Sequence, residues 1–195
     1  ASENSNSNTT VNNISSFEKK MIGLGVNYQS EKSNQFNIDF NLSYGTRATD
    51  VNTNQYLLHL NTSGLIKTSS KTQLFLRNKN GVLVSDSYLE NELFREGGTS
   101  SIRGFNEQSI IASKYSFVNS EFRLLSKNKS YLYSIQDLGL FYSNQKNNIL
   151  YSLGAGYNYI KGVNSIDISY IYGNSTKATT SFNSSILSIK LITLF

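Results

Sequence analysis

The clearest candidate for a functional group in this chain is an arginine that follows a double glycine. Arg103 lies in the run Gly-Gly-Thr-Ser-Ser-Ile-Arg-Gly-Phe, which begins at Gly97 and Gly98. An arginine side chain stays charged at physiological pH, and its planar fork of N–H donors fits a carboxylate. Two acidic residues, Glu121 and Asp137, follow further along the chain. These residue types predict a charge-assisted ion pair that holds the backbone in place.

The residues that usually carry out catalysis or bind metal are scarce. The chain has no cysteine and one histidine, His59. The absence of cysteine excludes a disulfide framework, a zinc finger and thiol catalysis, and one histidine leaves little for a metal site or a catalytic triad. No Gly-x-Ser-x-Gly elbow occurs. We therefore expect no enzyme activity, no metal and no cofactor, and we expect His59 to be an inward-facing polar residue without a role.

The composition is unusual for a soluble domain. Of 195 residues, 16% are charged, against about 25% in a typical soluble domain, and Pro and Trp are absent while Tyr numbers 13 and Phe 11. The net charge of +5 has no Lys/Arg cluster behind it, so no nucleic-acid partner is expected. No apolar run approaches the ~18 residues of a transmembrane helix. The polar start of the sequence carries no signal peptide, which we expect to have been removed or to lie on a part of the chain not shown.

Two-residue alternation runs through most of the sequence. In the segment 34–44, apolar or aromatic residues occupy every even position from 36 onward, and polar residues occupy the odd positions. Such alternation predicts β-strands with one apolar and one polar face, and no helical 3.6-residue stripe competes with it. We therefore predict an all-β, antiparallel fold with nine strands, near 19–30, 34–46, 54–67, 71–85, 114–126, 131–143, 148–160, 163–173 and 185–195.

The predicted strands fit a transmembrane β-barrel better than a soluble sandwich. Sandwich strands commonly have about five or six residues, whereas strands of a membrane barrel need about 9–11. Tyrosines gather near the strand ends, as the aromatic girdles of such barrels require. Periplasmic turns and extracellular loops of a barrel alternate in length. The predicted connections do likewise: those at 31–33, 68–70, 127–130 and 161–162 are short, and those at 47–53, 86–113, 144–147 and 174–184 are mostly longer.

Nine strands cannot close a bacterial barrel by themselves. Single-chain barrels have an even number of strands, and an unpaired strand edge cannot face hydrocarbon. We therefore expect residues 18–195 to be the C-terminal part of a larger barrel and residues 1–17 to belong to a polar extracellular loop. A ten-stranded barrel is the alternative, if part of the Asn/Ser-rich N-terminal tract forms a strand. Residues 86–113 form a loop long enough to suggest a function.

The segment 97–105 closely resembles a signature of the outer-membrane assembly and translocation barrels. In this superfamily of BamA, TamA and the two-partner-secretion transporters (the bacterial surface antigen family), the sixth extracellular loop bears a Val/Ile-Arg-Gly-Phe/Tyr tetrapeptide, which Ile102, Arg103, Gly104 and Phe105 match. The preceding Asn-Glu-Leu-Phe-Arg is similar to a Bacteroidetes-type branch. The resemblance implies a sixteen-stranded barrel whose lumen holds this loop, with the arginine on acidic residues of the inner wall.

Further motifs resemble the same superfamily. Five predicted strands follow the loop, as they do in the family. The segments Glu121-Phe122-Arg123 and Asp137-Leu138-Gly139 resemble the inward Glu-x-Arg and Asp-x-Gly of the next two family strands, and both acidic residues fall on polar positions of predicted strands. The C-terminal Phe195, with Ile189 and Leu191 on the same parity, resembles the β-signal that the assembly machinery reads.

The resemblance implies an integral protein of the bacterial outer membrane that assembles, inserts or translocates other proteins. The ion pair of Arg103 would either prop the loop or take part in gating. Expected partners are outer-membrane lipids and lipopolysaccharide, barrel strands and periplasmic domains outside this chain, accessory lipoproteins, and unfolded outer-membrane or secreted clients. A passive porin, or a structural barrel subunit of a larger envelope complex, is the alternative. An outer-membrane phospholipase lacks support, because His59 has no suitable Ser and Asp company.

Overall fold

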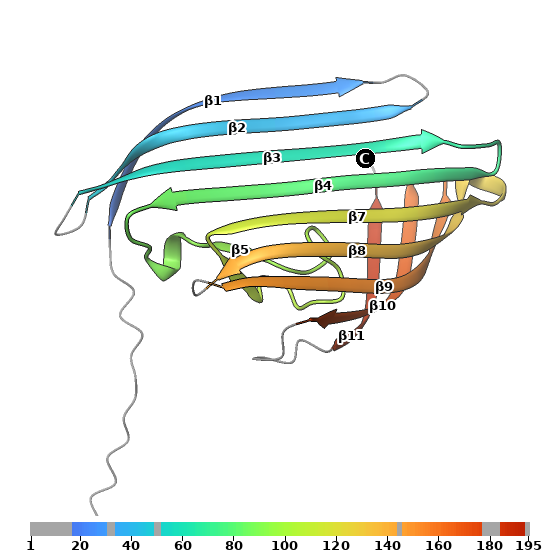
Figure 1. Ribbon diagram of the computed structural model, residues 1–195. Helices are drawn as coiled ribbons and strands as arrows, with labels where there is room; N and C mark the ends of the chain where they lie inside the picture. Colours follow the sequence, from blue (N-terminus) through green and yellow to red (C-terminus); the bar gives the residue numbers. More distant parts are fainter. Residues whose placement is uncertain (1–16, 31–33, 49–51, 144–145, 177–183, 194–195) are drawn as a thin grey trace, which may run out of the picture.

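One antiparallel sheet contains most of the chain in the computed structural model, which describes residues 17–30, 34–48, 52–143, 146–176 and 184–193. Its nine strands are hydrogen-bonded in the order of the sequence (Figure 1). The prediction of an all-β, antiparallel fold with nine long strands is therefore confirmed. The strands are β1 (Glu18–Ser30), β2 (Gln35–Ala48), β3 (Thr53–Lys67), β4 (Thr72–Ser85), β7 (Lys114–Leu125), β8 (Tyr131–Ser143), β9 (Lys146–Lys161), β10 (Asn164–Ser175) and β11 (Ser184–Thr193).

The observed strand ends lie close to the predicted ones, with one correction. We placed a connection at 144–147, but β9 begins at Lys146. The reason is that Lys146 and Asn147 pair with Ser143 and Tyr142 and so extend the ladder between β8 and β9. That connection is as short as the turns at the other end of the sheet. The expected N-terminal loop, the ten-strand alternative and Phe195 concern residues 1–16 and 194–195, outside the described residues.

Two strands of the described sheet have a neighbour on one side only. The strand order begins with β1 and ends with β11, and these two strands do not pair with each other. Within the described ranges, the nine strands therefore form an open sheet with two free edges. The helices in these ranges, η1 (Glu90–Glu92) and η2 (Lys127–Lys129), are single turns, and no helix there is long and apolar enough to cross a membrane.

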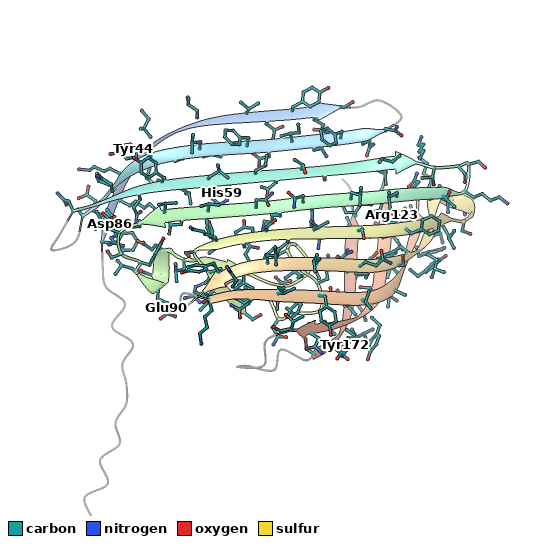
Figure 2. The ribbon with its side chains drawn as sticks, in the orientation of Figure 1. Tyr44, His59, Asp86, Glu90, Arg123 and Tyr172 are labelled. Atoms are coloured by element: carbon teal, nitrogen blue, oxygen red, sulfur yellow. The ribbon has the colours of Figure 1, made fainter. Side chains whose placement is uncertain are left out.

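The two faces of the sheet reverse the pattern of a soluble protein. The outer face carries exposed apolar side chains, among them Leu24 at 80% and Leu191 at 76% exposure. The opposite face, called the inner face below, contains polar side chains that are fully buried, such as Gln55 and Asn119. The antiparallel register keeps side chains of one parity together from strand to strand. Tyr44, labelled in Figure 2, lies on the outer face opposite Tyr56, with ring centroids 4.8 Å apart.

Part of the inner face is covered by the connection between β4 and β7, residues 86–113, which we call the long loop. It contains η1 and a small hairpin of β5 (Phe94–Glu96) and β6 (Ile110–Ala112), which we had not predicted. A buried apolar cluster forms where the loop meets the sheet. Figure 1 shows the sheet curving, with the loop on its concave side. The cluster comprises Ile102, Phe105, Ile110 and Ala112 of the loop and Tyr115, Phe117, Phe141 and Leu150 of the strands.

Candidate functional site

The structure brings Arg103 of the long loop onto the inner face of β7 and β8. Its Nε and Nη2 donate to the two carboxylate oxygens of Asp137 at 2.9 and 2.6 Å, and its backbone N–H donates to the same side chain at 3.0 Å. Its Nη1 donates to Glu121. All three residues are buried, each with less than a tenth of its surface exposed. We call this arrangement of Arg103, Glu121 and Asp137 the tip anchor.

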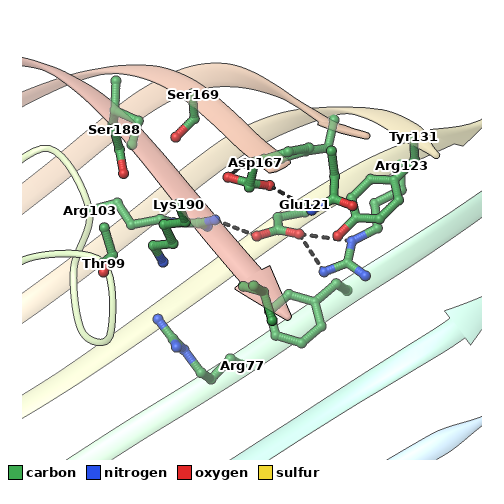
Figure 3. A pocket seen from close by; sticks show the side chains of 15 residues that line it. Arg77, Thr99, Arg103, Glu121, Arg123, Tyr131, Asp167, Ser169, Ser188 and Lys190 are labelled. Carbon is green, nitrogen blue, oxygen red and sulfur yellow. Dashed lines mark hydrogen bonds and ion pairs between the residues drawn. The ribbon is translucent and has the colours of Figure 1, made fainter. Parts of the chain in front are cut away.

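The second oxygen of Glu121 is used by another arginine. Arg123, two residues further along β7, donates to Glu121 Oε2 through Nε at 2.8 Å and Nη2 at 2.6 Å. Its guanidinium lies 4.8 Å from the ring centroid of Phe75 and 4.7 Å from that of Tyr131, within the range of cation–π attraction. Figure 3 shows Glu121 between Arg103 and Arg123. Within the Glu-x-Arg of β7, Arg123 therefore holds the Glu121 carboxylate that binds Arg103.

The two carboxylates of the tip anchor favour the charged form of the Arg103 guanidinium. Burial alone would lower the pKa of the Arg103 guanidinium, but the hydrogen bonds and charge of Asp137 and the charge of Glu121 raise that pKa above its usual value. Buried charges that are paired and fully hydrogen-bonded escape most of the cost of losing water. The arrangement can hold a loop in one position; it presents no nucleophile and base pair. Within the described ranges, no group of three or more His, Cys, Asp or Glu side chains could hold a metal ion.

A glycine on β8 makes room for the residue before Arg103. Ile102 is fully buried, and a Cβ atom on Gly139 would lie 2.6 Å from Ile102 Cδ1 and 2.8 Å from Phe117 Cδ1. Real Cβ atoms do not approach other atoms so closely, so a side chain at 139 would force Ile102 and Phe117 to shift. The Asp-x-Gly of β8 thus serves the loop twice, because Asp137 binds the arginine and Gly139 accepts the isoleucine.

The loop tip also touches the last two strands. Gly104 has φ of +83°, a conformation that favours glycine. A Cβ atom on Gly173 of β10 would lie 2.4 Å from the Gly104 carbonyl oxygen, and Ser184 of β11 donates a hydrogen bond to that oxygen. Phe105 is buried, with Gly173 close to its ring. Gly97 and Gly98, at φ of +112° and +84°, also have conformations that favour glycine, and the Ser101 N–H donates to the Gly98 carbonyl oxygen to form a turn at the start of the segment.

Sequence reasoning missed a second ion pair that holds the start of the long loop, which we call the base anchor. Arg47 of β2 lies 2.9 Å from Glu92 of η1, and both side chains are almost completely buried. Gln55 of β3 donates to the same carboxylate at 2.9 Å, and Arg47 also donates to Ser87 Oγ at 2.7 Å. Between the two anchors, Lys79 pairs with Glu96 at 2.9 Å. The sequence signal that could have predicted these pairs is the presence of inward-facing basic residues on β2 and β4 together with several glutamates in the loop.

The predicted β-signal residues lie away from the tip anchor. Ile189 and Leu191 are on the outer face of β11, where each is exposed by more than half. The structure therefore does not bring these residues together with Arg103, whose contacts are on the inner face. Phe195, the third member, lies outside the described residues.

The sequence matches no protein-family model and no curated protein.

Proposed function

We propose that this chain is the C-terminal part of an outer-membrane β-barrel of the BamA/TamA type, which inserts outer-membrane proteins or translocates proteins across the membrane. The observation that carries the proposal is the tip anchor. An Ile-Arg-Gly-Phe segment in a long loop places its arginine on an inward Glu and an inward Asp of the next two strands. These are the residues that the resemblance to this superfamily implies.

The reversed faces of the sheet support a location in the membrane. A band of exposed Leu, Ile, Val and Tyr side chains on the outer face would be costly in water but fits lipid. The polar inner face suits a barrel lumen. Unpaired backbone groups cost several kcal/mol each in hydrocarbon, so the edges of β1 and β11 need partners there. Further strands outside this chain would close the barrel, which by the resemblance has sixteen strands in total.

The position of the long loop favours an assembly or translocation barrel over a passive porin. The loop is fastened to inner-face residues of β2, β3, β4, β7 and β8. A loop held in this way would obstruct a lumen, whereas a porin keeps an aqueous channel. Client strands would pair with the free edge of β11, which is strand addition to an exposed sheet edge. The tip anchor would keep the loop from occupying that path.

The proposal is tested by replacing Arg103 in the full-length protein in its own cell. We expect Arg103→Ala to reduce the amount of folded client barrels in the outer membrane, measured by heat-modifiability on gels and by immunoblotting. Arg95→Ala is the matched control, because Arg95 belongs to the same loop and its side chain is 43% exposed. Among the described residues, its one ion pair is a 3.6 Å contact with exposed Glu90. Unchanged client levels in Arg103→Ala, or a steady open-pore conductance of the wild-type protein in planar bilayers, would reject the proposal.

A further inference from the structure

A polar pocket of about 240 Å³ lies on the inner face, between the tip of the long loop and β11. Figure 3 shows its side chains, with Lys190 and Arg77 entering it from different strands. Its walls include the rings of Phe75 and Tyr131, and Thr99 contributes from the loop. The ion pairs that hold the loop at the tip anchor do not require this open space.

The pocket has more positive than negative charge. Its lining includes four basic side chains, Arg77, Arg103, Arg123 and Lys190, but two acidic ones, Glu121 and Asp167. Glu121 is occupied by its two arginines.

The remaining acid, Asp167, is the partner of Lys190 in the register of β10 and β11, but its hydrogen bonds come from neutral donors. Asp167 accepts hydrogen bonds from the Tyr133 hydroxyl at 2.8 Å and from Asn158 at 3.1 Å. Arg77 donates to neutral acceptors, Asn119 Oδ1 at 2.8 Å and the Ser101 carbonyl at 2.9 Å. In the described part of the chain, neither Arg77 nor Lys190 forms an ion pair with a carboxylate.

We infer that this pocket binds a carboxylate carried by a polypeptide segment that lies along the inner side of β11. A carboxylate would accept charge-assisted hydrogen bonds from the guanidinium of Arg77 and the ammonium of Lys190. Lys190 and Ser188 belong to β11, which has an unpaired edge. A polypeptide that reaches this edge can therefore place a side chain in the pocket. The inference rests on the proposed function only in that the segment belongs to a client.

The inner-face position argues for a polypeptide rather than a lipid headgroup as the source of the anion. Apolar residues occupy the other parity of β11, at Leu187, Ile189 and Leu191, and this outer face is where lipid would lie. Phosphate groups of lipids would therefore be separated from Lys190 by the sheet. The aromatic walls at Phe75 and Tyr131 also suit a peptide, because they offer apolar surface beside the charged end.

The test uses the purified full-length protein folded in detergent and a fluorescein-labelled tri-glutamate peptide. We expect saturable binding by fluorescence anisotropy, weakened about tenfold by Lys190→Gln and retained by Lys190→Arg, since one charge-assisted contact is lost or kept. Lys161→Gln is the matched control, because Lys161 is an exposed lysine at the end of β9 and is not among the pocket residues. Its binding should equal that of the wild type.

Four outcomes would overturn the inference. Three of them are no saturable binding of tri-glutamate, equal binding of a tri-glutamine peptide, and equal loss in Lys161→Gln and Lys190→Gln. Displacement of the peptide by inorganic phosphate at the same concentration as by free tri-glutamate would show a simple anion site and would reject a peptide ligand. Peptide binding is measured on purified protein, whereas the proposed function is tested by client levels in Arg103→Ala cells. Failure of the peptide-binding test and failure of the proposed function can therefore be told apart.

Discussion

The two anchors of the long loop place the arginine and the carboxylate on opposite partners, and they differ in how many of their polar atoms are hydrogen-bonded. At the tip anchor the arginine belongs to the loop and the carboxylates to the strands, whereas at the base anchor the arginine belongs to the strand and the carboxylate to the loop. Each side-chain nitrogen of Arg103 donates a hydrogen bond. At the base anchor, Arg47 Nε and Gln55 Oε1 are buried and have no hydrogen-bond partner among the described residues.

This difference suggests that the anchors have different roles. A buried polar atom without a partner costs about 1–3 kcal/mol, so the base anchor retains less of the energy of its ion pair. The tip anchor has no such cost and also gains from the apolar packing of Ile102 and Phe105. The tip is thus held more strongly than the start of the loop, although the tip is further along the chain from β4, where the loop begins.

The largest effect is expected from Arg103→Ala, which leaves Glu121 and Asp137 buried without their shared cation. The free energy of unfolding in detergent, measured by urea titration with circular dichroism, should fall by about 3–5 kcal/mol. Asp137→Asn should add less than about 0.5 kcal/mol in the Arg103→Ala background, because both changes remove one interaction. Full additivity of the two substitutions would show that the residues are not energetically coupled.

A smaller effect is expected from Arg47→Ala at the base anchor. Glu92 would lose its ion pair but keep the hydrogen bond from Gln55, so the free energy of unfolding should fall by about 2–3 kcal/mol. The same urea titration measures this change. A loss in Arg47→Ala equal to or larger than that in Arg103→Ala would reverse the proposed ranking of the two ends. Arg95→Ala, on the exposed side of the loop, should change the free energy by less than about 0.5 kcal/mol.

Apart from the Arg95→Ala control, the smallest effect is expected from Gly139→Ala, which tests the space that β8 provides for the tip. The added methyl group would meet Ile102 at 2.6 Å, and overpacking of this kind costs about 1–3 kcal/mol. Ile102→Val in the same protein should restore part of this loss, because it removes the Cδ1 atom that meets the methyl group. A Gly139→Ala protein with wild-type stability would show that the loop tip shifts freely, and would weaken the distinction between the anchors.

The strands and the tip anchor could be predicted from sequence because each has a local or a parity-based signal. Two-residue alternation predicted the strands, and the same alternation placed Glu121 and Asp137 on the inner face. The base anchor could not be predicted in this way. Parity directs Arg47 inward but does not determine which of the loop glutamates reaches it, since that depends on the path of η1 and β5.

The remaining features depend on structure that leaves little trace in sequence. Strands β5 and β6 have three residues each, too few for any periodicity, and they pair because the loop folds back on itself. The close contact of Gly104 with Gly173 joins a loop to a strand far along the chain, and neither glycine indicates its partner. The pocket at Lys190 likewise forms only where six strands (β4 and β7 to β11) and the loop tip come together.

The hydrogen bond from Ser184 to Gly104 has a consequence for the timing of folding. The two residues are 80 positions apart, and Ser184 opens the final strand. Hairpins between neighbouring strands can form as soon as both partners exist, whereas a contact of such long range must wait for the intervening chain to be ordered. Seating of the loop tip is therefore a late event, and a nascent or truncated chain that lacks β11 would leave this contact unmade.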